Sequence, residues 1–247
     1  LVSLLYPTSN IDFCALFSQA RMFNLLSTRS ARQIYFGDSD LAMAFCVIKI
    51  GGSLMEVSRA LVRGLVDLSR DGDVFLVVPG GGPMADLVRE VQERYRITDE
   101  TAHWMAILAM EVYARFLADG TGAILTDEIS RSASGVGILL PYRPLKEDDR
   151  GLEHSWDYTS DSVAALVAWR LSADLVKATD VEGVILDGRV KGEILAEKLI
   201  GRETCIDQGA LRILMMSGKS CHILDGRDPH RFIANLKTRR GGTLIRG

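Results

Sequence analysis

The stretch Val47–Ser53, VIKIGGS, decides the fold. It puts one lysine inside a run of apolar residues, and two glycines follow at once. A short apolar run of this kind is typical of a buried strand, from which an unpaired ammonium is normally excluded because its burial is heavily penalised. We therefore expect Lys49 to lie at the end of a strand, with its amino group directed at a phosphate.

The chain repeats this order of apolar run, glycine turn and helical period. After a helical pattern over 54–71, the apolar run VFLVV at 74–78 leads into the turn PGGGP and a helical pattern over 84–95. Strands that alternate with helices pair in parallel and are buried on both faces. We predict an α/β fold, a three-layer αβα sandwich with a mainly parallel central sheet. Further helices are expected over 98–120, 160–171, 206–216 and 229–236, and further strands over 122–126, 136–140, 173–178, 183–190 and 221–226.

Local signals refine this prediction. Thr98 is a suitable N-cap for the helix that follows it. Asp187-Gly188, inside the run 183–190, is a strong signal for a short hairpin. The region 140–158 combines prolines and charges without a clear period, and we expect a long loop there, of the kind that is usually functional.

Composition excludes several classes of function. The 247 residues carry 29 Lys and Arg against 32 Asp and Glu, a formal net charge of -3, without a long basic run. We therefore expect no nucleic-acid partner. We also expect no membrane partner, because no apolar run approaches the roughly 20 residues that span a bilayer. The widely separated cysteines fit a reducing cytoplasm and argue against structural zinc; they are Cys14, Cys46, Cys205 and Cys221.

Residues 1–42 differ from the rest of the chain. They are Ser-rich and contain arginines with few acids, which is a faint sign of a transit peptide. We favour another interpretation, in which residues 1–42 are an N-terminal extension, disordered or ahead of the natural start, and Met43 begins the protein just before the first strand.

Two glycine-rich turns, each between a predicted strand and a helix, indicate an anion site. Such turns expose backbone N–H groups and a helix N-terminus, and both attract phosphate oxygens. The spacing is neither that of a P-loop nor that of a dinucleotide-binding turn.

Five motifs in order resemble the amino acid kinase family, which includes acetylglutamate, aspartate, glutamate-5 and uridylate kinases. They are VIKIGGS, VVPGGGP, YTSDSVAA, VKATDVEGV and GGTLI, and they span 47–245. Within the family, PGGGPMADLVRE, AHWMAILAM, LPYRPL and SWDYTSDSVAA are most similar to a branch that includes the kinase of methanofuran biosynthesis. In that branch ATP converts an aminomethylfuran-methanol phosphate to its diphosphate.

The resemblance implies a domain over 43–247, with an acceptor-binding part over about 43–172 and a nucleotide-binding part over about 173–247. It also implies Lys49 and Asp161 as catalytic residues, the lysine neutralising the transferring phosphoryl group and the aspartate organising the catalytic lysines. Backbone groups at Gly51, Gly52 and Ser53 would hold ATP, and Gly80, Gly81 and Gly82 would hold the acceptor. The nucleotide loop would supply Lys177, Thr179, Asp180 and Gly183.

Two departures from the family pattern are informative. Where acetylglutamate kinases read N-x-N-x-D, this chain reads Asp157, Thr159 and Asp161, so a carboxylate at 157 would favour a cationic acceptor such as an amine. The lysine of a further family motif, G-M-x-x-K, is replaced by Ile213, beside Arg212. Either Lys177 or Arg212 could supply the second cation, and the sequence does not choose between them.

Two more side chains are candidates for the acceptor pocket. His103 lies in the long helix that follows the second glycine turn, although a core histidine is the more common interpretation. Arg143 could bind the acceptor's phosphate through its planar fork, although a surface arginine is nearly as common.

No clustered metal-ligand pattern is evident in the sequence, and Mg²⁺ is expected to arrive with ATP, bridging its phosphates. No general base is needed, because a phosphate monoester with a second pKa of about 6 is already dianionic and nucleophilic at neutral pH. We predict an ATP-dependent kinase of a small phosphate acceptor that acts as a homo-oligomer, a dimer or larger. Uridylate, isopentenyl phosphate or amino acid kinase activity is the nearest alternative, and non-catalytic nucleotide or oxoanion storage is an alternative of another class.

Overall fold

A central eight-stranded sheet organises the computed structural model, which describes residues 45–131 and 134–247. The predictions for residues 1–42 lie outside these ranges. Among the described strands of this sheet, β9 and β10 pair antiparallel and all other neighbours pair in parallel. The strands, in spatial order, are β3 (Ile124–Thr126), β4 (Gly135–Leu139), β2 (Val74–Pro79), β1 (Cys46–Ile50), β5 (Asp174–Thr179), β9 (Ser220–Asp225), β10 (Thr243–Arg246) and β8 (Glu193–Leu195).

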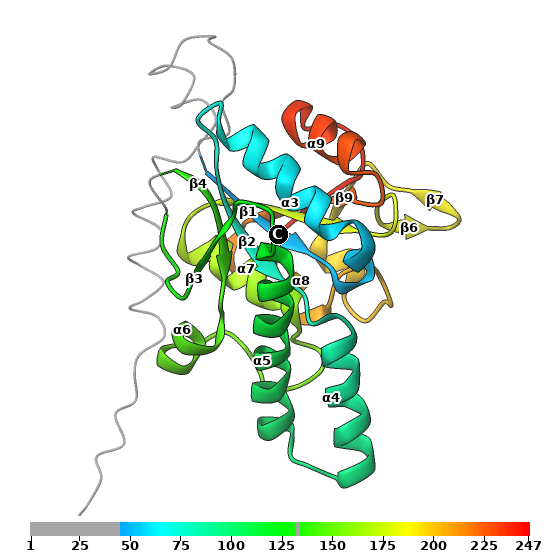
Figure 1. Ribbon diagram of the computed structural model, residues 1–247. Coiled ribbons are helices and arrows are strands. Elements are labelled where there is room, and N and C mark those ends of the chain that lie inside the picture. The colour runs from blue at the N-terminus through cyan, green and yellow to red at the C-terminus, as the bar shows by residue number, and fades with distance from the viewer. Residues whose placement is uncertain (1–44, 132–133) are drawn as a thin grey trace, which may run out of the picture. The chain divides into compact units, whose positions relative to one another are not determined.

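Helices cover both faces of this sheet, as Figure 1 shows, with α3 and α9 on one side and α7 and α8 on the other. The three-layer prediction is therefore confirmed. The helices are α3 (Met55–Ser69), α4 (Gly82–Tyr95), α5 (Asp99–Ala118), α6 (Tyr142–Glu147), α7 (Ser160–Arg170), α8 (Gln208–Ser217) and α9 (Pro229–Thr238), and short 3-10 turns cover Gly52–Leu54 and Ala196–Leu199.

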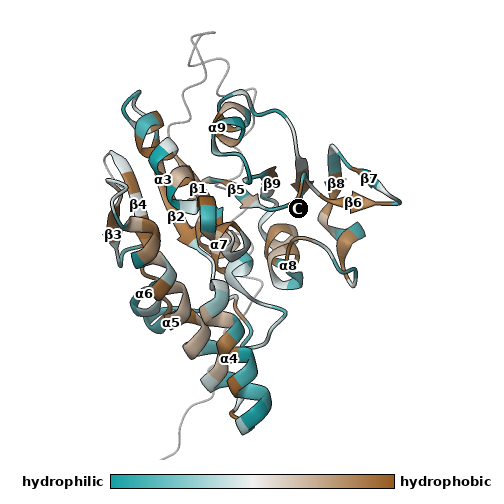
Figure 2. Ribbon diagram, turned by 45° about the vertical axis from the view of Figure 1, so that its right-hand side comes forward, coloured by the Kyte–Doolittle hydropathy of each residue, from teal (hydrophilic) through white to brown (hydrophobic). Residues whose placement is uncertain are grey.

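The core forms on both faces of β1 because its side chains alternate. Cys46, Ile48 and Ile50 pack under α3 and α9, whereas Val47 packs with the residues of α7. Lys49 shares the face of Val47, so its side chain enters the layer of α7. The helix α4, in contrast to the fully buried strand β1, is mostly hydrophilic, as Figure 2 shows, and Val88 is its one buried residue.

The local signals are largely confirmed. The Thr98 hydroxyl accepts a hydrogen bond from the backbone N–H of Thr101 at 3.2 Å and caps α5. The hairpin of β6 (Ile185–Leu186) and β7 (Arg189–Val190) turns through Asp187 and Gly188, whose φ angles of 53° and 70° suit the expected two-residue turn.

The loop prediction for 140–158 was partly wrong, because α6 lies inside it. That helix has six residues, too few for a helical period to stand out against its flanking prolines and charges. The strands β8 and β10 were also not expected. They are short, and β8 gains its hydrogen-bonding partner only from β10, some 50 residues further along the chain.

Candidate active site

Two lysines and one aspartate form the charged centre of the molecule. Lys49 on β1 and Lys177 on β5 are directly opposite each other in the parallel register. Their ammonium groups contact different oxygens of Asp161, at 2.7 Å for Lys49 and 2.5 Å for Lys177. Asp161 lies in the first turn of α7, and all three residues are at least nine-tenths buried.

The charges of this trio do not balance. Burial lowers the pKa of Lys49, and repulsion from Lys177 acts in the same direction, against the attraction of Asp161. Burial also acts to raise the pKa of Asp161, but Lys177 and Lys49 outweigh it and hold that pKa well below its usual range. Two buried amines thus share one ionised carboxylate, and a bound anion such as a phosphoryl group would favour the protonated form of Lys49.

Asp207, which the sequence analysis did not select, fixes the position of Asp161. It caps α8, and its carboxylate accepts hydrogen bonds from the backbone N–H groups of Thr159, Ser162 and Ala210 and from both hydroxyls of Thr159 and Ser162, at 2.6–3.1 Å. Its own backbone N–H donates to Asp161 Oδ2 at 3.2 Å. The N-terminal turns of α7 and α8 are thereby joined beneath the charged centre.

The two glycine turns lie against each other. A Cβ on Gly52 would overlap Gly82, and a Cβ on Gly80 would lie 2.9 Å from the backbone nitrogen of Gly52. The backbone N–H of Gly51 donates to Ala178 O at 3.2 Å, and that of Gly80 donates to Ile50 O at 2.8 Å. Both groups are therefore occupied, and the phosphate contacts expected of Gly51 and Gly80 do not fit this geometry.

A cavity of about 540 Å³ opens beside these turns. Its wall includes six of the predicted site residues, together with an arginine, acids and aromatic residues that the sequence analysis did not select. The predicted ones are Gly52, Ser53, Gly81, Gly82, His103 and, at the entrance to α7, Thr159; the others of chemical interest are Asp86, Arg89, Asp99 and Trp156.

Arg89 and Trp156 form a pair between this cavity and the next. The Arg89 guanidinium lies 4.0 Å from the centre of the Trp156 indole ring, and the indole N–H donates to Gln92 Oε1 at 2.5 Å. A guanidinium positioned in this way has a fixed direction and can bind phosphate through two hydrogen bonds.

A second cavity of about 730 Å³ shares Arg89, Trp156 and Thr159 with the first. Its remaining wall contains Asp161, the predicted nucleotide-loop residues Thr179 and Asp180, and the segment 203–207. Of the charged centre, Asp161 lies in the wall of this second cavity, two residues along the chain from Thr159, which both cavities share. A transfer between two bound molecules requires two such adjoining sites.

Three predicted residues lie elsewhere. Asp157 is 57% exposed at its side chain and pairs with Arg212 at 3.4 Å, outside both cavity walls. Arg143 pairs with Asp127 at 3.0 Å on the surface. Gly183, with φ of 155°, packs against Thr243 where the hairpin meets β10.

The structure also separates the two candidates for the second cation. Ile213, at the position of the family lysine, is fully buried in the core, and Arg212 is held at the surface by Asp157. Lys177 contacts the same carboxylate as Lys49. Its amino group is further held by the carbonyl of Cys205. No local signal identifies Lys177, because its place depends on the pairing of β1 with β5.

Comparison with known proteins identifies relatives that are kinases. Residues 44–138 match the model of the amino acid kinase family. The chain is 30% identical over 203 residues to the [5-(aminomethyl)furan-3-yl]methyl phosphate kinase of Methanocaldococcus jannaschii, covering 77% of this chain and 92% of that enzyme. It is 27% identical to the uridylate kinase of Thermofilum pendens, covering 82% and 97% of the two chains.

The fold is likewise similar to solved kinase structures. The uridylate kinase of Archaeoglobus fulgidus superimposes with a TM-score of 0.61 at 20% identity, covering 81% of this chain and 99% of that one. The fold and the site together describe a phosphoryl-transfer enzyme of the αβα type. The chain belongs to the amino acid kinase family and is a kinase. None of its described helices has both the length and the apolar character needed to cross a bilayer.

Proposed function

We propose that this kinase transfers the γ-phosphoryl group of ATP to a small phosphate monoester that carries an amine, an aminomethylfuran-methanol phosphate, and so forms its diphosphate. The observation that carries this proposal is the buried centre of Lys49, Asp161 and Lys177, whose carboxylate lines one of two adjoining cavities. The acceptor is inferred from the likeness to the Methanocaldococcus jannaschii enzyme.

The first cavity is assigned to the acceptor. Arg89, already fixed over Trp156, would bind the acceptor's phosphate at the boundary between the cavities. Asp86 and Asp99, also in the cavity wall, would face the amine. This assignment replaces Asp157, whose carboxylate is paired with Arg212 outside the cavity.

The second cavity is assigned to ATP. Its wall holds Thr179 and Asp180, in the loop after β5, which would receive the ribose or a neighbouring donor. Asp180 and Glu203 supply oxygen ligands of the kind that Mg²⁺ prefers, so the donor set fits an ion carried in with the nucleotide. When bound, Mg²⁺ would neutralise charge on the β- and γ-phosphates.

The transfer needs positioning and charge more than proton chemistry. An oxygen of the acceptor's phosphate forms the new bond to the γ-phosphorus, while the bond from that phosphorus to the bridging oxygen of ADP breaks in line with it. Lys49 and Lys177 would stabilise the charge that gathers on the equatorial oxygens, and Asp161 would hold both amines in place. The acceptor is already dianionic near neutral pH, so no group has to remove a proton.

The test is release of ADP from magnesium ATP with the full chain and four acceptors: the aminomethylfuran-methanol phosphate, UMP, isopentenyl phosphate and acetylglutamate. Selective turnover of the furan supports the proposal. Selective turnover of another acceptor would keep the charged centre and discard the acceptor assignment. ATP binding without turnover of any acceptor would favour a storage or sensing protein, which the kinase relatives argue against.

A further inference from the structure

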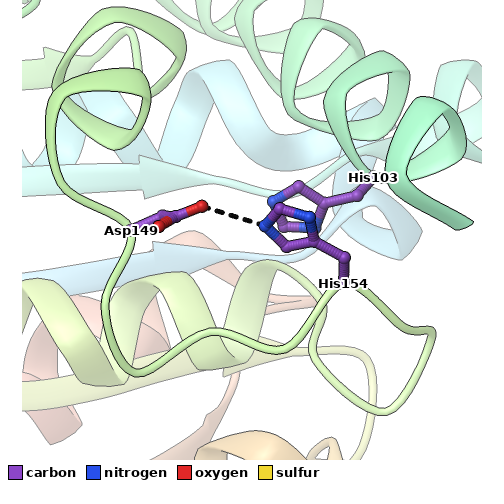
Figure 3. A group of neighbouring side chains, drawn as sticks. All are labelled: His103, Asp149 and His154. Atoms are coloured by element: carbon purple, nitrogen blue, oxygen red, sulfur yellow. Dashed lines mark hydrogen bonds and ion pairs between the residues drawn. The ribbon is translucent and has the colours of Figure 1, made fainter. Parts of the chain in front are cut away.

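A second polar cluster includes His103, which also lies in the wall of the first cavity. His103 comes from α5, and Asp149 and His154 come from the loop over 148–159 that joins α6 to α7. One ring nitrogen of each histidine and one carboxylate oxygen of Asp149 lie within 4.8 Å of one another. Figure 3 shows the two imidazoles lying face to face with Asp149 directed at them.

One nitrogen of this cluster lacks a partner. His103 is only 8% exposed, and its Nε2 finds no hydrogen bond among the described residues. A buried polar atom in that state costs roughly 1–3 kcal/mol. Burial lowers the pKa of His103 to about 4, with the nearby His154 acting in the same direction. The His103 ring is therefore neutral at physiological pH and keeps one nitrogen lone pair available to a ligand.

The other members supply a matching set of donors. Imidazole and carboxylate together are typical ligands of zinc and other divalent transition metals, at about 2.0–2.2 Å. Across a tetrahedral ion two such ligand atoms lie about 3.3–3.6 Å apart. The donor atoms of the cluster, which lie within 4.8 Å of one another, therefore have to approach by at most about 1.5 Å. His154 is now held by Glu100 and, at 2.9 Å, by Asp149.

One ring has to turn for all three donors to reach the same ion. The imidazoles are stacked at 3.9 Å between centres with 13° between their planes, and a ring nitrogen binds a metal in the plane of its ring. His154 is the ring with room to turn, because it lies in a loop and its side chain is 23% exposed. Metal binding would also displace any proton on His154.

We propose that His103, Asp149 and His154 form a binding site for a divalent transition-metal ion, with zinc as the best match, and that the ion ties the loop 148–159 to α5. Glu100 would then orient His154 or complete the coordination as a fourth ligand. The same loop supplies Ser155, Trp156 and Tyr158 to the wall of the acceptor cavity. The bound ion would hold that wall in place, in a role separate from that of magnesium beside ATP.

The site can be tested without reference to kinase activity. The full chain is stripped with a chelator and titrated with zinc chloride against a chromophoric competitor, and with cobalt chloride to record its visible d–d absorption. The variants are His103→Ala, His154→Ala and Asp149→Asn. The matched control is His230→Ala, which removes an exposed histidine on α9. Circular dichroism confirms that each variant is folded.

The expected result is one zinc per chain, with affinity reduced about tenfold or more in each of the three variants and unchanged in the control. The cobalt band should appear in the wild type and be lost in His103→Ala. Equal zinc affinity in wild type and His154→Ala would overturn the proposal, as would an absence of zinc binding by the wild type. In that case His154 would act as a protonated bridge between Glu100 and Asp149. Failure of this proposal would leave the kinase assignment untouched, since the two rest on different residues.

Discussion

Two polar clusters each place one residue in a cavity wall, His103 in the first cavity and Asp161 in the second, and they are built in opposite ways. The trio of Lys49, Asp161 and Lys177 is held by adjacent strands and the first turn of a helix, and each charge has a partner. The cluster of His103, Asp149 and His154 joins a helix to a loop and leaves one buried nitrogen unpaired. The first is held by regular secondary structure and carries the proposed anion site, whereas the second depends on a loop and carries the proposed cation site.

The largest expected effect comes from the first cluster. Lys49→Ala should reduce kcat by about 10²–10³-fold, the range seen when one preorganised charge stabiliser is removed from an active site. The measurement is ADP release with the acceptor that the wild type turns over. Lys198→Ala removes an exposed lysine and should change nothing. If Lys49→Ala turned over nearly as fast as this control, the proposed role of Lys49 in stabilising the transferred phosphoryl group would be wrong.

Asp161→Asn should have the largest effect on stability. It leaves two buried amines without their carboxylate, and breaking a buried ion pair in this way costs about 3–5 kcal/mol. The folded-state pKa of Asp161 lies below its ordinary value of 3.8, so its contribution is present above pH 3.8 and is lost as the pH falls through the folded-state value. Urea unfolding of the wild type and of Asp161→Asn at pH 7 and at pH 3 measures this contribution. The difference between their free energies of unfolding should be smaller at pH 3.

The glycine turns beside the first cluster permit a matched pair of substitutions. Gly52→Ala should destabilise the protein by about 1–3 kcal/mol and impair ATP turnover, because the new Cβ overlaps Gly82 in the other turn. Gly51→Ala should be tolerated, since its φ is -68° and the nearest contact, with Ala178 O, is 3.4 Å. Thermal unfolding and ADP release compare the two. Equal behaviour would mean that close packing of the turns does not explain the glycines.

The first cavity, proposed for the acceptor, gives a more moderate prediction. Arg89→Ala should raise KM for the acceptor about tenfold or more, because it removes a charge-assisted contact to the acceptor's phosphate. KM for ATP should rise less, since Arg89 also lines the second cavity but the nucleotide has other contacts there. Asp157→Asn is the comparison, and it should alter neither constant, since Asp157 is paired with Arg212 outside the cavity. A selective loss of amine-bearing acceptors in Asp157→Asn would restore the earlier prediction for that residue.

The second cluster gives the smallest effect, a dependence of stability on pH. Burial acts to lower the pKa of His154, but Glu100 and Asp149 outweigh it and raise that pKa above its ordinary value of 6.5. The stabilisation is complete below pH 6.5 and is lost as the pH rises through the folded-state value. Metal-free wild type and His154→Ala should therefore differ more in melting temperature at pH 6 than at pH 9. A difference that grew with pH would contradict the contacts of His154.

Much of the candidate site was predicted because its signals are local. Lys49 stands out as a charge in an apolar run, and the glycine turns follow strands directly. Asp161 was selected through its match to a family motif. The family motifs also selected Lys177, which the structure brings together with Asp161, but two other selected residues lie elsewhere. Asp157 and Arg143 are close to site residues in the sequence, but each forms an ion pair at the surface, Asp157 with Arg212 and Arg143 with Asp127.

The sequence by itself determined most of the order of strands and helices, without α6, β8 and β10, together with the hairpin at Asp187-Gly188 and the cap at Thr98. Each of these features depends on side chains only a few residues apart. Only the tertiary structure decided that Lys177 is the partner of Lys49, that Asp207 joins two helix starts, and that His154 meets His103. These contacts join residues about 45 or more positions apart, with strand register or loop path setting the distance. A periodic pattern reports which face of an element is buried, and it carries no information about which distant element lies against that face.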